Sequence, residues 1–101
     1  MARLEARSRI LKALGHPSRL MIVEELSRGE RCVADLTGLV GADMSTVSKH
    51  LSLLKSVGIV DDDKRGNQVF YQIATPCVLN FFDCLEQVME ANVQRQIFLA
   101  R

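Results

Sequence analysis

Three cysteines, Cys32, Cys77 and Cys84, carry the most distinctive chemistry in this 101-residue sequence. A deprotonated cysteine is a nucleophile and a ligand for soft ions. Cys77 and Cys84 are seven residues apart, so on one straight helix they share a face but lie about 10 Å apart along its axis. Because each metal–sulfur bond is about 2.3 Å long, such a helix cannot place both thiolates on one ion. The same separation excludes a disulfide within that helix.

These thiols can still converge in three ways. The helix can begin after Cys77, or antiparallel last helices in a dimer can place Cys77 beside the partner's Cys84, or the fold can bring Cys32 close as a third thiolate. The opposing interpretation is that all three are small core residues, since free cysteine is among the most buried residue types. The sequence leaves open whether a sulfur site lies within one subunit or between two.

A second set of polar residues lies on one predicted helix. Val47, Leu51 and Leu54 recur at helical spacing and predict its buried face. The opposite side carries short hydroxyl side chains and a lysine, which can bond either to DNA bases or to phosphates. The alternative is an ordinary solvated helix face. The predicted DNA contacts of this helix are Ser45, Thr46, Ser48, Lys49 and Ser52.

This helix is the second of a pair joined by a tight turn. Apolar residues recur at helical spacing in Val33–Val40 and again in Val47–Val57. Gly41-Ala42-Asp43 interrupts the pattern and predicts the turn between the two helices. We expect the hydroxyl of Ser45 to cap the second helix, and Gly58 to end it in the left-handed conformation.

A β-hairpin is predicted after these helices. Ile59–Asp61 and Val69–Ile73 suit two short strands, with Asp63–Asn67 as the turn. At its tip, Lys64 and Arg65 would contact phosphate or enter the minor groove. The alternative is a salt-bridged surface turn, because three aspartates precede them. Two helices followed by a hairpin with a basic tip form a winged helix-turn-helix, whose second helix can lie in the major groove.

Further helices are predicted at both ends of the chain. The first ends at Gly15-His16-Pro17, and Ser18 is expected to cap the next, which ends at Gly29. The last begins at Thr75-Pro76, and its apolar residues cover more than half of its circumference. A domain of this length cannot bury that much apolar surface, so we expect a homodimer through the first and last helices. The fold class is mostly α with a small β-hairpin wing, and residues 1–101 form one domain.

Several motifs, in this order, resemble those of the ArsR/SmtB family of small bacterial winged-helix repressors. The likeness covers roughly Leu4 to Val93. It implies a homodimeric repressor that binds a near-palindromic operator in double-stranded DNA, needs no cofactor to do so, and releases the DNA when an effector binds. The motifs are Leu14-Gly15-His16-Pro17-Ser18-Arg19-Leu20, Val33-Ala34-Asp35-Leu36, Ser45-Thr46-Val47-Ser48-Lys49-His50-Leu51, Leu54-Lys55 and Gly58-Ile59-Val60.

The resemblance also bears on the cysteines. Thiol-type members of the family carry a Cys-Val-Cys-Asp-Leu motif, of whose two cysteines this chain keeps only the first, Cys32, because Ala34 stands at the second. Thr37 replaces a further cysteine that some members carry. The last helix has carboxylates but no histidine, so the other zinc site common in the family is not expected. We therefore expect an effector site at Cys77 and Cys84, with Cys32 as a candidate third ligand. Three thiolates suit trivalent arsenic or antimony, whereas zinc or cadmium would need a fourth ligand.

Two alternatives to this hypothesis remain. The thiols could sense oxidants or persulfides, with Cys77 activated by its place in the first turn of a helix. The winged helix could also bind another protein instead of DNA, since residues 43–70 contain four basic and four acidic residues. An enzyme is not expected, because no orienting group accompanies Cys32 and His50. No apolar run is long enough for a membrane span or a signal peptide, so we expect a cytoplasmic protein.

Overall fold

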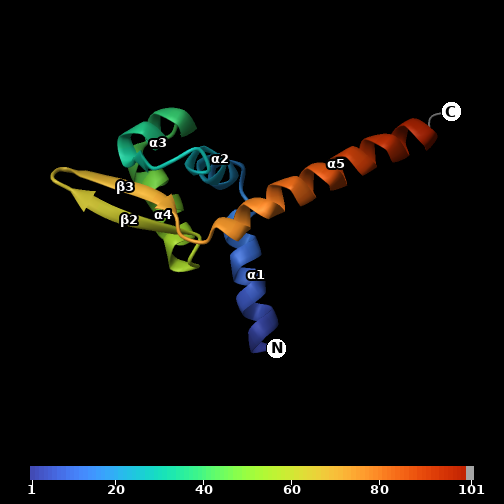
Figure 1. Ribbon diagram of the computed structural model, residues 1–101, viewed down its shortest axis with the longest axis horizontal. Helices are drawn as coiled ribbons and strands as arrows, with labels where there is room; N and C mark the ends of the chain where they lie inside the picture. The colour runs from blue at the N-terminus through green and yellow to red at the C-terminus, as the bar shows by residue number, and fades with distance from the viewer. Residues whose placement is uncertain (100–101) are drawn as a thin grey trace.

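The computed structural model describes residues 1–99 and has the predicted winged helix-turn-helix fold (Figure 1). Residues 100 and 101 of the predicted domain lie outside the described residues. The elements in chain order are α1 (Ala2–Leu14), α2 (Pro17–Leu26), β1 (Arg31–Cys32), α3 (Val33–Val40), α4 (Met44–Ser56), β2 (Val60–Arg65), β3 (Gln68–Ile73), the 3-10 helix η1 (Pro76–Leu79) and α5 (Asn80–Leu99).

One hydrophobic core joins α2, α3 and α4 to the sheet. Leu51 and Leu54 of α4 and Leu36 of α3 have no exposed surface. The turn between α3 and α4 depends on Gly41, whose φ of 75° is a left-handed conformation that glycine adopts without steric cost. Gly58 has a φ of 85° just after α4, as predicted. The helix pair is therefore fixed by the apolar spacing and by these two glycines.

Two predicted helix caps were wrong by a few residues. The carboxylate of Asp43, not the hydroxyl of Ser45, caps α4, because it accepts a hydrogen bond of 2.7 Å from the backbone N–H of Thr46. In α2 the cap is His16, whose Nδ1 accepts a bond of 3.1 Å from the backbone N–H of Ser18. Both helices begin earlier than predicted, so the expected capping serines lie inside their first turns.

The hairpin, called the wing below, comprises β2 and β3 and is longer than predicted. The strands pair antiparallel from Val60 opposite Ile73 to Arg65 opposite Gln68. The turn is therefore only Gly66-Asn67, and the positive φ of 62° at Gly66 suits the first position of a two-residue hairpin turn. Lys64 and Arg65 consequently lie in a strand, where neighbouring side chains point to opposite faces.

A third strand was not predicted. The two residues of β1 pair antiparallel with β3, placing Arg31 opposite Tyr71 and Cys32 opposite Phe70, so the strand order is β1-β3-β2. Two residues are too short to show an alternating pattern in the sequence. The strand matters for function because it brings the segment after α2 against the wing.

The terminal helices project from this body (Figure 1). The last helix begins at Thr75-Pro76 as predicted, first as η1 and then as α5. Its apolar residues are largely uncovered: Leu85 is 46% exposed and Met89 58%, while Leu11 of α1 is 57% exposed. Over residues 1–99 no helix is long and apolar enough to cross a membrane. The two projecting helices therefore carry apolar surface that this chain alone does not bury.

Candidate nucleic-acid interface and cysteine positions

The polar face of α4 points away from the core. Val47 and Leu51 have no exposed surface, whereas four of the five predicted contacts are exposed and Ser48 is half-buried. Lys49 makes no ion pair with any residue from 1 to 99. This face can therefore offer hydroxyl groups and one unneutralised ammonium to a ligand. The exposed residues are Ser45, Thr46, Lys49 and Ser52.

Hydrogen bonds fix the N-terminal end of α4. Asp43 accepts from the backbone N–H of Thr46 and, at 3.0 Å, from the hydroxyl of Ser45. These bonds, first those from Thr46, and the nearby charge of Lys49 lower the pKa of Asp43. The hydroxyl of Ser45 is thereby oriented before any ligand arrives.

One face of the wing is turned toward α4. Lys55 of α4 forms an ion pair of 2.8 Å with Asp62 of β2, which also raises the pKa of Lys55. Because side chains alternate along a strand, Lys64 lies on the same face as Asp62, two residues nearer the tip. Lys64 has no ion pair within residues 1–99. It therefore extends the uncompensated positive charge of α4 onto the wing.

Arg65 lies on the opposite face and is neutralised. Its Nη1 and Nη2 donate to the two carboxylate oxygens of Glu30 at 2.7 and 2.9 Å, and its Nε donates to Asp63 at 2.9 Å. Its guanidinium carbon is 4.6 Å from the centroid of the Phe70 ring, a cation–π distance. The hydrogen bond from Arg65 lowers the pKa of Glu30. Of the two predicted wing contacts, only Lys64 is thus left without an acidic partner among the described residues.

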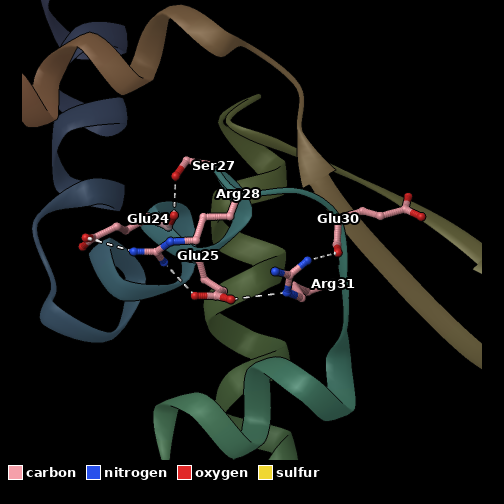
Figure 2. Close-up of polar contacts among 6 residues, drawn as sticks. All are labelled: Glu24, Glu25, Ser27, Arg28, Glu30 and Arg31. Carbon is pink, nitrogen blue, oxygen red and sulfur yellow. Dashed lines mark hydrogen bonds and ion pairs between the residues drawn. The ribbon is translucent and has the colours of Figure 1, made fainter.

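Glu30 was not predicted as a partner of Arg65, because the two residues are 35 positions apart in the sequence. Its position is set by the loop after α2, which Arg31 anchors by donating to the carbonyl of Glu30 at 2.8 Å and to the carboxylate of Glu25 at 3.3 Å. Arg28 forms a second ion pair with Glu25, at 2.8 Å. Figure 2 shows that the carboxylate of Glu30 points away from this cluster, which leaves it available to the wing.

A further polar cluster ties α4 to α1 and α2. Arg19 donates to the carbonyls of Ala13 and Lys12, at 2.6 and 3.3 Å, and contacts Nδ1 of His50 at 3.2 Å. Since arginine can only donate, this Nδ1 must be the unprotonated nitrogen of the ring. Burial, followed by the charges of His16 and Arg19, lowers the pKa of His50. His50 therefore has a structural position, between Arg19 and the ring of His16.

The three cysteines border different hollows. Cys32 is 7% exposed and stands at the N-cap position of α3 without a capping bond from its side chain. It borders a hollow of about 270 Å³ shared with Met44 and Ser48 of α4. Cys77 and Cys84 are both exposed. Each borders a hollow that reaches α1, at Ile10 for Cys77 and at Leu11 for Cys84.

This arrangement bears on the predicted metal site. Within residues 1–99 no three histidine, cysteine or carboxylate side chains are grouped closely enough to hold an ion. A sulfur site confined to one subunit would therefore require rearrangement. Cys77 and Cys84 both lie beside the uncovered surface of α1 and α5, and a site that they form across a dimer stays a prediction.

A profile of the family described as bacterial regulatory protein, arsR family, matches residues 16–62. The chain is 37% identical over 71 residues to the HTH-type transcriptional repressor SmtB of Mycobacterium tuberculosis, an alignment that covers 70% of this chain and 53% of that protein. It is 38% identical over 77 residues to the cadmium resistance transcriptional regulatory protein CadC of Listeria innocua, covering 75% of this chain and 65% of that one. The chain thus spans between half and two thirds of the length of these curated relatives.

A solved structure shares the fold. It is the homodimeric winged helix-turn-helix DNA-binding domain of a possible ArsR-family transcriptional regulator from Mycobacterium bovis, with a TM-score of 0.80 and 32% identity. The match covers 93% of this chain and 87% of that one. It therefore includes the terminal helices as well as the winged body.

Proposed function

The chain belongs to the ArsR/SmtB family of bacterial regulatory proteins, and from this premise we propose that it is a homodimeric transcriptional repressor that binds double-stranded DNA. In this proposal α4 enters the major groove, and the wing contacts the adjacent backbone. Two copies would bind the two halves of a near-palindromic operator, since a two-fold dimer presents two identical α4 helices. No cofactor is needed for this binding.

The observation that carries the proposal is the surface shared by α4 and the wing. Lys49 and Lys64 both lie on it, and neither has an acidic partner within residues 1–99. The zero net charge of residues 43–70 had favoured a protein-binding module. Of the four acidic residues of that region, Asp62 pairs with Lys55 and Asp63 with Arg65. Asp61 lies on the other face of the wing by strand alternation, and Asp43 is bonded to the N-terminal end of α4. A locally positive strip therefore remains despite the neutral total.

DNA selection followed by a salt series tests this proposal. A duplex enriched from random sequence should bind with an association constant that falls steeply with salt, because each neutralised phosphate contributes a slope of about 0.9 on logarithmic axes. Lys49→Gln should weaken binding, whereas Glu24→Gln, on an exposed part of α2 away from this surface, should not. An association constant that does not change with salt, or no enrichment of any duplex, would favour a protein-interaction module instead.

The effector is the finer part of the proposal. We infer that a thiophilic ion binds thiolates of Cys77 and Cys84 at the dimer interface and weakens DNA binding through the terminal helices. The exposure of both thiols beside α1 supports this position, and the family relative named for cadmium resistance supports the class of ligand. Trivalent arsenic or antimony remains our first candidate, because zinc or cadmium would need a fourth ligand in addition to three thiolates.

Arsenite titrated into the reduced protein on its selected duplex tests the effector. We expect release of DNA, with a coupling of about tenfold or more. Cys77→Ser/Cys84→Ser should abolish the response, and Cys32→Ser reports whether the buried thiol takes part. A wild-type DNA affinity that arsenite and antimonite leave unchanged would contradict this effector class, while leaving the proposed DNA binding intact.

A thiol-based redox response is the second candidate for regulation. It is favoured by the same exposure of Cys77 and Cys84, because accessible thiols without a bound ion can be oxidised. Mass spectrometry after mild oxidation should then find one specific bridge that joins two chains and lowers DNA affinity. Scattered or absent oxidation would contradict it.

A further inference from the structure

The wing carries opposite charge on its two faces. Asp62 and Lys64 are turned toward α4, where Lys55 neutralises Asp62 and leaves the positive charge of Lys64. Asp61, Asp63 and Arg65 share the other face by strand alternation, and Glu30 joins them through Arg65. Three carboxylates and one guanidinium give that face a net charge of −2. A phosphate would be attracted to the first face and repelled by the second.

Arg65 is held on the acidic face by more than a single contact. Glu30 binds it with both carboxylate oxygens, a bidentate geometry that is among the stronger forms of ion pair. Asp63 binds the remaining Nε, and the ring of Phe70 lies beneath the guanidinium. To reach a phosphate, Arg65 would have to give up two carboxylates and a cation–π contact for one anion.

Glu30 is itself held in place from the other side. Its carbonyl accepts from Arg31, which also binds Glu25 of α2, so the loop that bears Glu30 is fixed to the body of the domain. Figure 2 shows its carboxylate pointing outward from that anchored loop. The pair of Glu30 and Arg65 therefore links the tip of a projecting hairpin to the body.

We propose that Glu30 is a positioning residue for DNA binding: it withholds Arg65 from phosphate and fixes the wing so that Lys64 is the wing cation that contacts the DNA backbone. This inference rests on the proposed DNA-binding function and narrows it. It assigns different roles to two adjacent basic residues: Lys64 contacts DNA, and Arg65 holds the wing to Glu30. It also makes an acidic residue outside the helix-turn-helix a determinant of affinity.

Salt dependence of DNA binding distinguishes these roles. With two wings per dimer and a slope of about 0.9 per phosphate, Lys64→Gln should reduce the slope by about 2. Arg65→Met, which keeps much of the side-chain volume without the charge, should leave the slope unchanged. Glu30→Gln should steepen it, because part of the arginine population is freed to reach phosphate.

Two further variants separate release of Arg65 from simple loss of negative charge. Asp61→Asn removes a carboxylate from the same face without freeing a cation, so its slope should match the wild type. In a Glu30→Gln/Arg65→Met double variant the steepening should disappear, because Glu30 acts through Arg65. Hydrogen exchange of the β2 amides should accelerate in Arg65→Met and Glu30→Gln but not in Lys64→Gln.

The outcomes that overturn the inference are specific. If Arg65→Met reduces the slope as much as Lys64→Gln does, Arg65 contacts DNA and its proposed structural role is wrong. An unchanged slope in Glu30→Gln, or unchanged exchange in Arg65→Met, also overturns it. A wild-type protein without salt-dependent DNA binding would instead overturn the proposed function itself, and the two failures are therefore distinguishable.

Discussion

The winged body and the terminal helices differ in what covers their apolar side chains. Leu51 of α4 has no exposed surface, whereas Leu85 of α5 is 46% exposed and Val93 is 52% exposed. The body builds its own core from α2, α3, α4 and the sheet, joined by Ala13 and Leu14 at the end of α1 and by Val78 of η1. The terminal helices do not, and their apolar faces suit burial against a second molecule. The body can thus be explained from one chain, and the terminal helices only from two.

Charged residues show the same contrast. Every ion pair found within residues 1–99 joins residues between Glu24 and Arg65, in the body. The helix α1 is rich in basic residues and α5 in acidic ones, yet neither takes part. The two helices therefore carry net charges of opposite sign. The residues concerned are Arg3, Arg7, Arg9 and Lys12 in α1 and Asp83, Glu86 and Glu90 in α5.

The largest effect should follow truncation in the core of the body. Leu51→Ala leaves a cavity under α4, and we expect a loss of about 2–5 kcal/mol in the free energy of unfolding. Chemical denaturation followed by circular dichroism measures it. The matched truncation Leu85→Ala should cost much less at dilute concentration, where subunits separate. Equal costs at every protein concentration would remove the distinction between body and terminal helices.

The second-largest effect should follow from placing a charge on α5. Val93→Glu would bury an unpaired carboxylate in the proposed dimer contact, and we expect the dimer dissociation constant to rise about a hundredfold or more. Sedimentation equilibrium measures that constant. Gln94→Glu, a neighbouring exposed polar position, serves as the control and should have little effect. A dimer unaffected by Val93→Glu would mean that this part of α5 lies outside the contact.

Loss of the α4 cap should have a moderate effect. Asp43→Ala removes the acceptor for the backbone N–H of Thr46, and the thermal midpoint should fall by a few degrees. Ser45→Ala should change it less, because that hydroxyl only donates to Asp43. Differential scanning calorimetry compares the two variants. A greater loss in Ser45→Ala would restore Ser45 as the cap that the sequence had suggested.

The smallest effect should be a pH dependence from His50. Its pKa in the folded state is lowered from the usual 6.5, so below about pH 6.5 the unfolded chain takes up this proton more readily than the folded one. Stability should therefore decrease as the pH falls through this window and stop decreasing below the folded pKa. His50→Gln should flatten the decrease in unfolding free energy between about pH 7.5 and 5.5. An identical pH profile in the variant would contradict this role.

The sequence predicted the elements that depend on local patterns better than the contacts between distant segments. The apolar spacing predicted α3, α4 and the wing because these elements depend on local periodicity and on glycines at turns. Both caps were expected at serines, Ser45 and Ser18, because hydroxyl residues are common helix caps. In the structure, the side chains of Asp43 and His16 accept hydrogen bonds from the free backbone N–H groups instead. The exposed face of α4 was predicted correctly for the same local reason.

Contacts between distant segments could not be predicted in this way. The two-residue strand β1 shows no period, and the bond between Glu30 and Arg65 joins residues 35 positions apart. The three cysteines are not grouped within one chain: Cys32 precedes α3, Cys77 lies in η1 and Cys84 in α5, and spacing in the sequence does not show what a second chain would bring to them. Residue spacing along a sequence predicts which face of a helix is apolar, but not which segment or molecule that face packs against.

Native mass spectrometry of the complex with a selected duplex tests the central claim most directly. The account predicts two chains on each bound duplex, and loss of that species in Val93→Glu, because the terminal helices join two winged bodies. A stable complex of one chain per duplex, equally abundant in Val93→Glu, would contradict it.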